Sequence, residues 1–143
     1  MIFAKFPQTE ITKHWMTLKK HLEENLPPTA LGLPINLDEV YTRLMTDEMQ
    51  GWVFLQGEDA IGFLITAFSQ ELGFNFKNLT IYAVVATQHI DDEAWKNAFS
   101  TVKAFSIKYE CKRIIAFSSN PRVIELVNKL GGESSYHVLT LEV

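Results

Sequence analysis

The unbroken apolar run LTIYAVVA, residues 79–86, constrains the fold most strongly, because a pattern of helical spacing follows it directly. An uninterrupted apolar run rich in β-branched residues is typical of a central strand that is covered on both faces. The helical pattern starts after Asp91 or Asp92, either of which can cap a helix. Its apolar positions are Trp95, Phe99, Val102, Phe105 and Tyr109. We therefore predict a strand over residues 78–87 and a helix over residues 92–109.

The chain before this unit contains two further helical patterns and a hairpin. Apolar residues at spacings of three and four predict one helix from Thr9 to Leu26, and a shorter helix starts at Asn36 or Asp38. Between them, residues 25–36 carry three prolines and a glycine, so this loop is the best candidate for a hinge. Two apolar runs flank the turn QGED and predict a β-hairpin over residues 51–71.

The chain after residue 109 predicts a strand, a helix and a last strand. RIIAFSS, residues 113–119, has the composition of a buried strand. Asn120 then caps a helix, Pro121 occupies its first turn and Gly131 ends it. The segment SYHVLTLEV, residues 135–143, predicts the last strand. The order of elements indicates an α/β (α+β) fold, a mixed sheet flanked by helices, in a single domain over residues 1–143.

Composition excludes several classes of function. The net charge is −4 with both signs mixed along the chain, so the basic surface that nucleic acid requires is absent. A single cysteine allows no internal disulfide and no thiolate cage, and His14 and His21 lie too far apart on one helix for a shared metal. No apolar window approaches the roughly 18 residues of a membrane span. We expect no nucleic acid, membrane or metal partner, and a cytoplasmic location.

Two segments resemble the GNAT superfamily of acetyl-CoA-dependent N-acetyltransferases. SSNPRVIELVNKLGG, residues 118–132, is similar to the family segment Asn-x-x-Ala-x-x-Leu-Tyr-x-Lys-Leu-Gly-Phe, and CKRIIAFSS, residues 111–119, is similar to the family's fifth strand. The positions in register are Asn120, Leu126, Lys129, Leu130 and Gly131. With the order of elements, the resemblance extends over roughly residues 9–143. It implies a GNAT-like acyl-CoA N-acyltransferase fold with a mostly antiparallel mixed sheet.

The resemblance also implies where acetyl-CoA would bind. In the family the fourth strand diverges from the fifth, and its exposed backbone pairs with the pantetheine arm of the cofactor. If acetyl-CoA binds, the resemblance therefore assigns it to Val84, Val85 and Ala86, with Gln88 and Asn120 nearby. The pyrophosphate of the cofactor sits on a Gln/Arg-x-x-Gly-x-Gly/Ala loop at the start of the next helix in this family.

The sequence departs from the family at that loop. Gln88 is kept, but Asp91 and Glu93 stand where the two glycines belong, and no glycine occurs from Phe74 to Leu130. Glycines let phosphate oxygens approach the backbone amides closely. Two like charges about 6 Å apart repel by roughly 3 kcal/mol at an effective dielectric near 20. We interpret the acids at 91–93 as capping groups of a helix that has lost its phosphate site.

A second departure concerns proton transfer. Val127 stands where the family commonly has the tyrosine that protonates the departing thiolate. No carboxylate lies in the predicted strand over 78–87, so Glu71, near the end of the hairpin, is the one weak candidate for a general base.

Two hypotheses follow. In the first, the chain is a GNAT-fold module that has lost ordinary acetyl-CoA turnover, needs no cofactor and acts by binding a protein, within a larger assembly or as a homo-oligomer. Small GNAT-like proteins encoded by bacteriophages are similar to it. In the second, the chain is a divergent N-acetyltransferase that moves acetyl from acetyl-CoA to an amine, with Lys96 partly replacing the anion site. We favour the first because two chemical parts are missing together.

Overall fold

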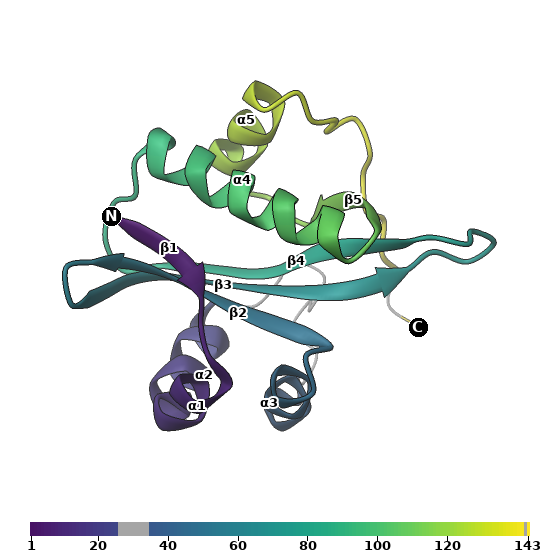
Figure 1. Cartoon of the computed structure of the whole chain (residues 1–143). Helices are drawn as coiled ribbons and strands as arrows, with labels where there is room; N and C mark the ends of the chain where they lie inside the picture. Colours follow the sequence, from purple (N-terminus) through teal and green to yellow (C-terminus); the bar gives the residue numbers. More distant parts are fainter. Residues whose placement is uncertain (26–34, 142) are drawn as a thin grey trace.

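One five-stranded mixed sheet, with helices on both faces, organises the chain (Figure 1). The computed structural model describes residues 1–25, 35–141 and 143, so most of the predicted hinge at 25–36 lies outside the described residues. The strands, in spatial order, are β1 (Ile2–Lys5), β2 (Met49–Gln56), β3 (Asp59–Gln70), β4 (Lys77–Ala86) and β5 (Cys111–Ala116). The first four strands pair antiparallel, and β4 pairs parallel with β5.

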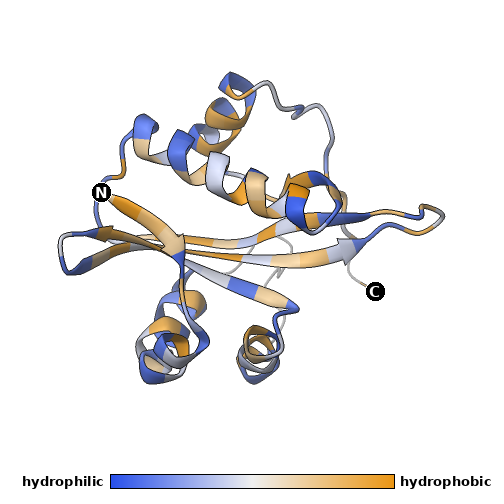
Figure 2. Cartoon of the chain, in the orientation of Figure 1, coloured by the Kyte–Doolittle hydropathy of each residue, from blue (hydrophilic) through white to orange (hydrophobic). Residues whose placement is uncertain are grey.

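The five helices lie in two layers. They are α1 (Gln8–Lys13), α2 (Trp15–Glu24), α3 (Leu37–Met45), α4 (Asp92–Lys108) and α5 (Pro121–Lys129). Figure 1 shows α1, α2 and α3 on one face of the sheet and α4 and α5 on the other. Figure 2 shows apolar residues on the strands and on helix faces turned towards the sheet, while polar residues dominate the outer helix faces. Among the described residues, no helix is long and apolar enough to cross a membrane.

A β-bulge in β4 changes which face of the sheet its side chains cover. Ile65 of β3 pairs with Ala83 and the next residue, Thr66, pairs with Ile81, so Tyr82 is the extra residue. Before the bulge, Ile81 belongs to the core under α4. After it, Ala83 belongs to the core under α1, α2 and α3. The strand is therefore covered on both faces, as its unbroken apolar run predicted.

A chain of buried hydrogen bonds joins β2 to β3. The Trp52 indole Nε1 donates to the Thr66 hydroxyl at 2.9 Å, and that hydroxyl donates to Gln50 Oε1 at 2.8 Å. The Gln50 amide then donates to the Asp47 carbonyl at 2.7 Å, in the turn before β2. Each polar group in this chain has a partner, which is the condition under which buried polar groups do not destabilise a core.

Much of the predicted secondary structure is confirmed. The hairpin forms as β2 and β3, and Gly57 in its turn has a φ of 64°. The predicted strand over 78–87 forms as β4. Asn36, Asp91 and Asn120 cap α3, α4 and α5, each accepting a hydrogen bond from a backbone amide of the first turn. These signals are local, so they survive in the folded chain.

One expectation about the N-terminal part is wrong, and one strand was not predicted. The predicted single helix from Thr9 is interrupted at His14, whose φ of −108° and ψ of 13° are not helical. The bend lets Ile11 of α1 and Leu22 of α2 both bury against a twisted sheet. β1 was not predicted, because four residues are too few for a clear alternating pattern.

Two expectations about the C-terminal part are also wrong. β5 is the last strand of the sheet and is only partly buried, whereas a buried strand was predicted. The predicted strand over residues 135–143 does not form in the described part of that segment. The two errors concern the same edge of the sheet, since a last strand formed by residues 135–143 beside β5 would have covered β5.

The polar chain between β2 and β3 predicts a large effect for Thr66→Val. Valine has the same shape but leaves the Trp52 indole and the Gln50 carbonyl oxygen without their shared partner. We expect a loss of about 2 to 4 kcal/mol in the free energy of unfolding, measured by urea denaturation. The matched control is Thr101→Val on the exposed side of α4, where a loss below about 0.5 kcal/mol is expected. Equal losses would contradict this account.

The cap of α4 predicts different effects for two adjacent aspartates. Asp91 accepts a hydrogen bond from the Ala94 amide at 2.8 Å, so Asp91→Ala should lower the free energy of unfolding by about 1 kcal/mol. Asp92 makes only exposed ion pairs, and Asp92→Ala should cost less than about 0.5 kcal/mol. Urea denaturation of both variants compares them. A larger loss for Asp92→Ala would show that capping is not the main role of Asp91.

Candidate functional site

β4 and β5 part along their length, and this opens a wedge in the sheet. The last paired residues are Ile81 and Ala116. β4 nevertheless continues for five residues, to Ala86, which still pairs with Gly62 of β3. Among the described residues, the side of β4 that faces β5 therefore has no strand partner over residues 82–86. We call this opening, between residues 82–86 of β4 and the chain that follows β5, the wedge.

The free backbone groups in the wedge belong to alternate residues. The Thr87 amide donates to the Ile61 carbonyl of the hairpin at 2.9 Å. In an antiparallel pair the two backbone groups of a residue point the same way, and the direction alternates along the strand. The backbone of Val85 is therefore directed to β3, while that of Val84 and Ala86 faces the wedge. Of the three residues assigned by the resemblance, two present free hydrogen-bonding groups.

Tyr82 lies where the two strands part. It is the bulged residue of β4, and its side chain packs against the core on the α1, α2 and α3 face. Burial, with a smaller contribution from the Glu39 carboxylate, raises the pKa of the Tyr82 phenol. The phenol therefore stays protonated near neutral pH. No sequence pattern predicts this position, because a bulge depends on the register between two strands.

The three acids at the start of α4 do not share one space. Asp91 caps the helix, and both Asp91 and Glu93 line a hollow of about 210 Å³ together with Phe3 of β1 and Phe54 of β2. Asp92 is the acid that contacts α5. The three charges are therefore divided between the β1 side and the α5 side of the helix.

Two cations of α5 surround Asp92. Arg122 Nη2 lies 3.8 Å from Asp92 Oδ1, and Lys129 Nζ lies 3.8 Å from Asp92 Oδ2. Arg122 also donates to the Ile90 carbonyl at 2.7 Å, and its Nη1 lies 3.5 Å from His89 Nδ1. Arg122 thus ties the start of α5 to the loop that joins β4 to α4. Arg122 was not among the residues predicted from the sequence, although it directly follows the Asn120 cap and Pro121.

The structure brings most of the predicted site residues to this end of the sheet. Gln88 is exposed in the loop between β4 and α4. Asn120 caps α5 by accepting from the Arg122 amide at 3.0 Å, and Val127 is half-buried on the same helix. Glu71 lies apart from them. It follows β3, where it pairs with Arg113 and accepts from Asn78 at 2.9 Å, near the start of β4 rather than beside the wedge.

The remaining candidates do not form a second site. Burial raises the pKa of the Cys111 thiol, partly opposed by Lys77, so the thiol is not activated as a nucleophile. His14, between α1 and α2, lies 3.4 Å from the Glu10 carboxylate of α1. Within the part of the chain that the structure describes, no three histidine, cysteine or acidic side chains are grouped to hold a metal ion.

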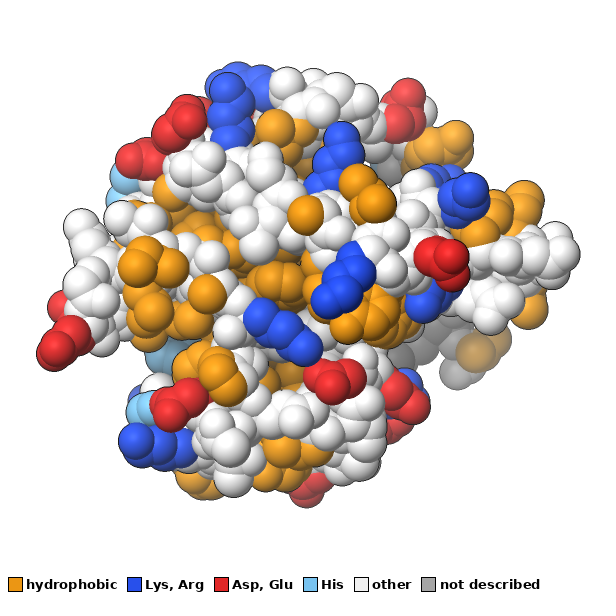
Figure 3. Space-filling view, viewed as in Figure 1, with side chains coloured by type: hydrophobic (Ala, Val, Ile, Leu, Met, Phe, Trp, Pro, Cys, Tyr) orange, Lys and Arg blue, Asp and Glu red, His pale blue; other side chains and the backbone are white. Residues whose placement is uncertain are grey.

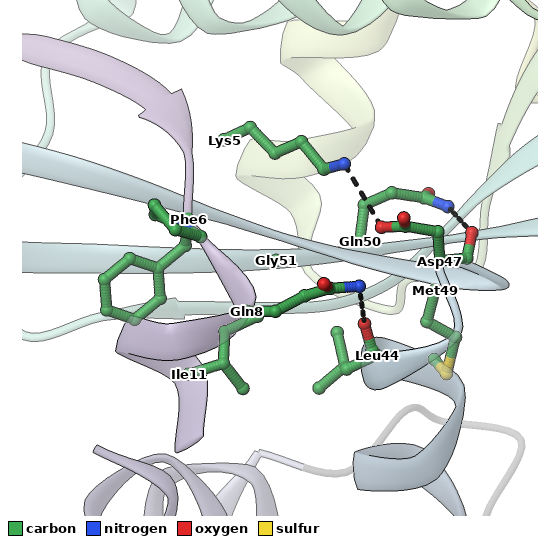
Figure 4. A pocket seen from close by; sticks show the side chains of 10 residues that line it. Lys5, Phe6, Gln8, Ile11, Leu44, Asp47, Met49, Gln50 and Gly51 are labelled. Carbon is green, nitrogen blue, oxygen red and sulfur yellow. Dashed lines mark hydrogen bonds and ion pairs between the residues drawn. The ribbon is translucent and has the colours of Figure 1, made fainter. Parts of the chain in front are cut away.

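A second hollow, of about 290 Å³, lies at the opposite edge of the sheet (Figure 4). It is bounded by the β1–α1 connection, the end of α3 and β2. Its polar side chains are already paired: Lys5 with Asp47 at 3.3 Å, and Gln8 with the Met45 carbonyl at 2.9 Å. Figure 3, which has the orientation of Figure 1, shows apolar side chains on this face of the molecule, interspersed with charged side chains. These bonds join the elements around the hollow, and the hollow lies far from the wedge because β3 and β4 intervene.

Searches by sequence and by structure gave different results. No family model and no curated protein sequence matches the chain. Aminoglycoside N-acetyltransferase AAC(6')-Iy, solved with CoA, superposes with a TM-score of 0.71 at 14% identity, over 99% of this chain and 98% of that one. A GNAT family acetyltransferase from Staphylococcus aureus gives 0.64 at 20%, over 99% and 98%. A ribosomal-protein-alanine N-acetyltransferase from Brucella melitensis gives 0.68 at 8%, over the full length of both chains.

The structural matches agree with the topology. All three cover nearly the whole of this chain, and each is an acetyltransferase. At these identities they establish a shared fold and leave the chemistry to the residues of the site. The chain has the fold of the GNAT acetyltransferases.

Proposed function

We propose that this protein is an acetyl-CoA-dependent N-acetyltransferase. The observation that carries the proposal is the wedge, in which β4 continues for five residues without a partner on the β5 side. A buried strand normally satisfies its backbone groups with a neighbouring strand, so an unpaired stretch beside a parallel partner suits an extended ligand rich in amides. The pantetheine arm of acetyl-CoA is such a ligand. Structural neighbours bind CoA and a CoA-linked bisubstrate analogue.

The residues at the wedge fit this ligand in two parts. The free backbone groups of Val84 and Ala86 would pair with the amides of the arm, and this contact does not depend on side-chain identity. Arg122, half exposed beside the loop between β4 and α4, would contact the diphosphate. A guanidinium binds phosphate oxygens through several donors in one plane, which a glycine loop achieves with backbone amides.

The charge balance near the loop also supports binding. The two cations that flank Asp92 offset its charge, while Glu93 lines the hollow on the β1 side. The roughly 3 kcal/mol of repulsion estimated for two like charges about 6 Å apart therefore does not apply in full. Asp91 still opposes binding of the diphosphate, because its carboxylate already accepts the hydrogen bond of the Ala94 amide, which a bound anion would otherwise accept.

Bound acetyl-CoA would supply a thioester, and the amine nitrogen would attack its carbonyl carbon. A C–N bond would form, the C–S bond would break, and the thiolate would take up the proton lost by the amine. This chain offers Tyr82 as a protonated phenol where β4 and β5 part. Val127 cannot donate a proton, and Glu71 is engaged with Arg113 near the start of β4. A phenol that stays neutral is suited to donating a hydrogen bond rather than to accepting the proton of the amine.

A second candidate, a GNAT-fold module that binds a protein without turnover, is favoured by one observation. The Ala94 amide at the start of α4 is already bonded to Asp91, and the described loop between β4 and α4 has no glycine that would expose other backbone amides to a diphosphate. For either function, the single cysteine supports a cytoplasmic location.

Calorimetric titration with acetyl-CoA tests the proposal. We expect a dissociation constant in the micromolar range, and release of free CoA thiol when amines are added. An aminoglycoside and a peptide with an N-terminal alanine represent the acceptors named for structural neighbours. The absence of binding at millimolar acetyl-CoA would overturn the enzyme and favour the protein-binding module.

The role of Arg122 is tested in the same titration. Arg122→Met keeps the length of the side chain but removes the cation beside the loop, so acetyl-CoA should bind about tenfold more weakly, which corresponds to about 1.4 kcal/mol. Arg43→Met is the matched control, because Arg43 pairs with Glu39 and Glu48 on the opposite face of the sheet. Equal affinities for the two variants would remove Arg122 from the site and leave the enzyme proposal standing.

A further inference from the structure

Asn78 in β4 carries a buried oxygen that has no partner among the described residues. The residue is fully buried, and its Oδ1 accepts no hydrogen bond. The other end of the same amide, Nδ2, donates to Glu71 Oε1 at 2.9 Å. An ionised carboxylate can only accept, so this bond fixes the orientation of the amide and leaves the oxygen unpaired. A buried acceptor without a donor destabilises the folded chain and is rare.

Asn78 is the first of three polar side chains on one face of β4. Leu79 and Ile81 belong to the core under α4, so Asn78 and Thr80, which alternate with them, face the layer of α1, α2 and α3 (Figure 1). Tyr82 also packs against the core on that side. We call Asn78, Thr80 and Tyr82 the polar row. It leads from the β3–β4 turn to the point where β4 and β5 part.

Hydrogen-bond acceptors gather at the Asn78 end of the polar row. Ser69 of β3 lies opposite Asn78, and its hydroxyl oxygen is 2.7 Å from that of Thr80. The side-chain hydrogen bonds from Asn78 and Arg113 to Glu71 both end on Oε1, so Oε2 of Glu71 is a further acceptor. An ammonium group has three donors and no acceptor. Asn78 Oδ1, Glu71 Oε2 and the hydroxyl pair have the complementary chemistry.

Glu71 and Arg113 connect the buried Asn78 amide with solvent. Both side chains are part exposed, and Glu71 contacts Asn78 directly. Arg113 also lies over the Phe76 ring, with its Cζ 5.7 Å from the ring centroid. Figure 1 shows the β3–β4 turn projecting beyond the other strands and the helices, so this end of the row lies at the rim of the molecule. Part-exposed side chains change rotamer readily, and movement of Glu71 would expose Asn78 Oδ1 to a cation.

A carboxylate stands near each end of the polar row. Glu71 contacts Asn78 at one end. At the other end, burial is the main cause of the raised pKa of the Tyr82 phenol and the Glu39 carboxylate adds to it, so Glu39 lies near that end. The hydrogen bonds from Arg43 to Glu39 end on Oε1, as those to Glu71 do. Two carboxylates at the ends of one row favour a ligand with a positive charge at each end.

We propose that the polar row binds the acceptor amine and that this acceptor is a linear diamine. The inference rests on the proposed function, because acetyl transfer would take place where β4 and β5 part. Asn78 and Tyr82 are four residues apart, a distance of about 13 Å along a strand. One ammonium of the diamine donates to Asn78 Oδ1 and to the Glu71 carboxylate, and the amine at the far end, in its neutral form, lies beside Tyr82. A monoamine would leave Asn78 Oδ1 without a donor.

Titration calorimetry of the full chain without acetyl-CoA tests the diamine site. Diaminooctane, with an amine at each end, should bind about tenfold more tightly than octylamine, because only the diamine brings a second ammonium to Asn78. Asn78→Leu keeps the size of the side chain and should reduce this preference to less than about twofold. Asn75→Leu is the matched control, since Asn75 is exposed in the β3–β4 turn, and it should keep the wild-type preference.

Two results of the titration would overturn the diamine site. One is the absence of a preference for the diamine in the wild-type chain, whether both amines bind equally or neither binds. The other is an unchanged preference in Asn78→Leu.

Urea denaturation separates a ligand-binding role of Asn78 from a structural one. Asn78→Leu should raise the urea midpoint of unfolding, because it removes a buried oxygen that has no donor. A higher midpoint together with weaker diamine binding is the pattern of a residue kept for a ligand against the interest of stability. A lower midpoint would show that the Asn78 amide is satisfied within the fold, and it would overturn the inference.

Diamine binding is measured without acetyl-CoA, so this inference and the proposed enzyme fail separately. Absence of acetyl-CoA binding together with the diamine preference would overturn the enzyme and keep the diamine site. Acetyl-CoA binding without the preference would overturn the diamine site alone.

Discussion

The extra residue in β4, Tyr82, is the constraint on which the rest of the structure depends. By inserting one residue opposite β3, it moves the following side chains to the other face of the sheet. The same point ends the pairing with β5, because Ile81 is the last residue of β4 with a partner there. One irregularity thus sets the two cores and opens the wedge. The proposed acetyl-CoA site follows from it.

The charges beside the wedge differ between the sequence pattern and the folded chain. Taken as a sequence, the three acids at 91–93 argued for a lost phosphate site. In the folded chain Arg122 and Lys129 of α5 meet Asp92, while Asp91 and Glu93 lie towards β1 and β2. The helix that follows β5 thereby supplies cations to the loop that follows β4. Two segments remote in sequence make the proposed site, and neither brings acids and cations together alone.

Sequence patterns predicted most helices and strands, but they did not predict which strand lies at the edge of the sheet. Asp91, Asn120 and Gly57 mark the starts of helices and a tight turn, because capping and positive φ are satisfied by neighbouring residues. Residues 111–119 have the composition of a buried strand, yet β5 is an edge, since burial depends on what lies beside it. Of the residues of the proposed acetyl-CoA site, Val84 and Ala86 were expected through the resemblance, and Arg122 was not. Arg122 is held beside the loop by its hydrogen bond to the carbonyl of Ile90, 32 positions earlier.

The sequence by itself determined the order of elements from α3 to α5, the caps, the covering of β4 on both faces and the absence of a glycine-rich loop. These follow from periodicity and from the conformations that single residues permit. Only the tertiary structure decided where β4 and β5 part, which acids meet cations and which strand lies at the edge of the sheet. The physical reason is that strand register and charge pairing depend on distances between remote parts of the chain, and those distances exist only after the sheet has formed.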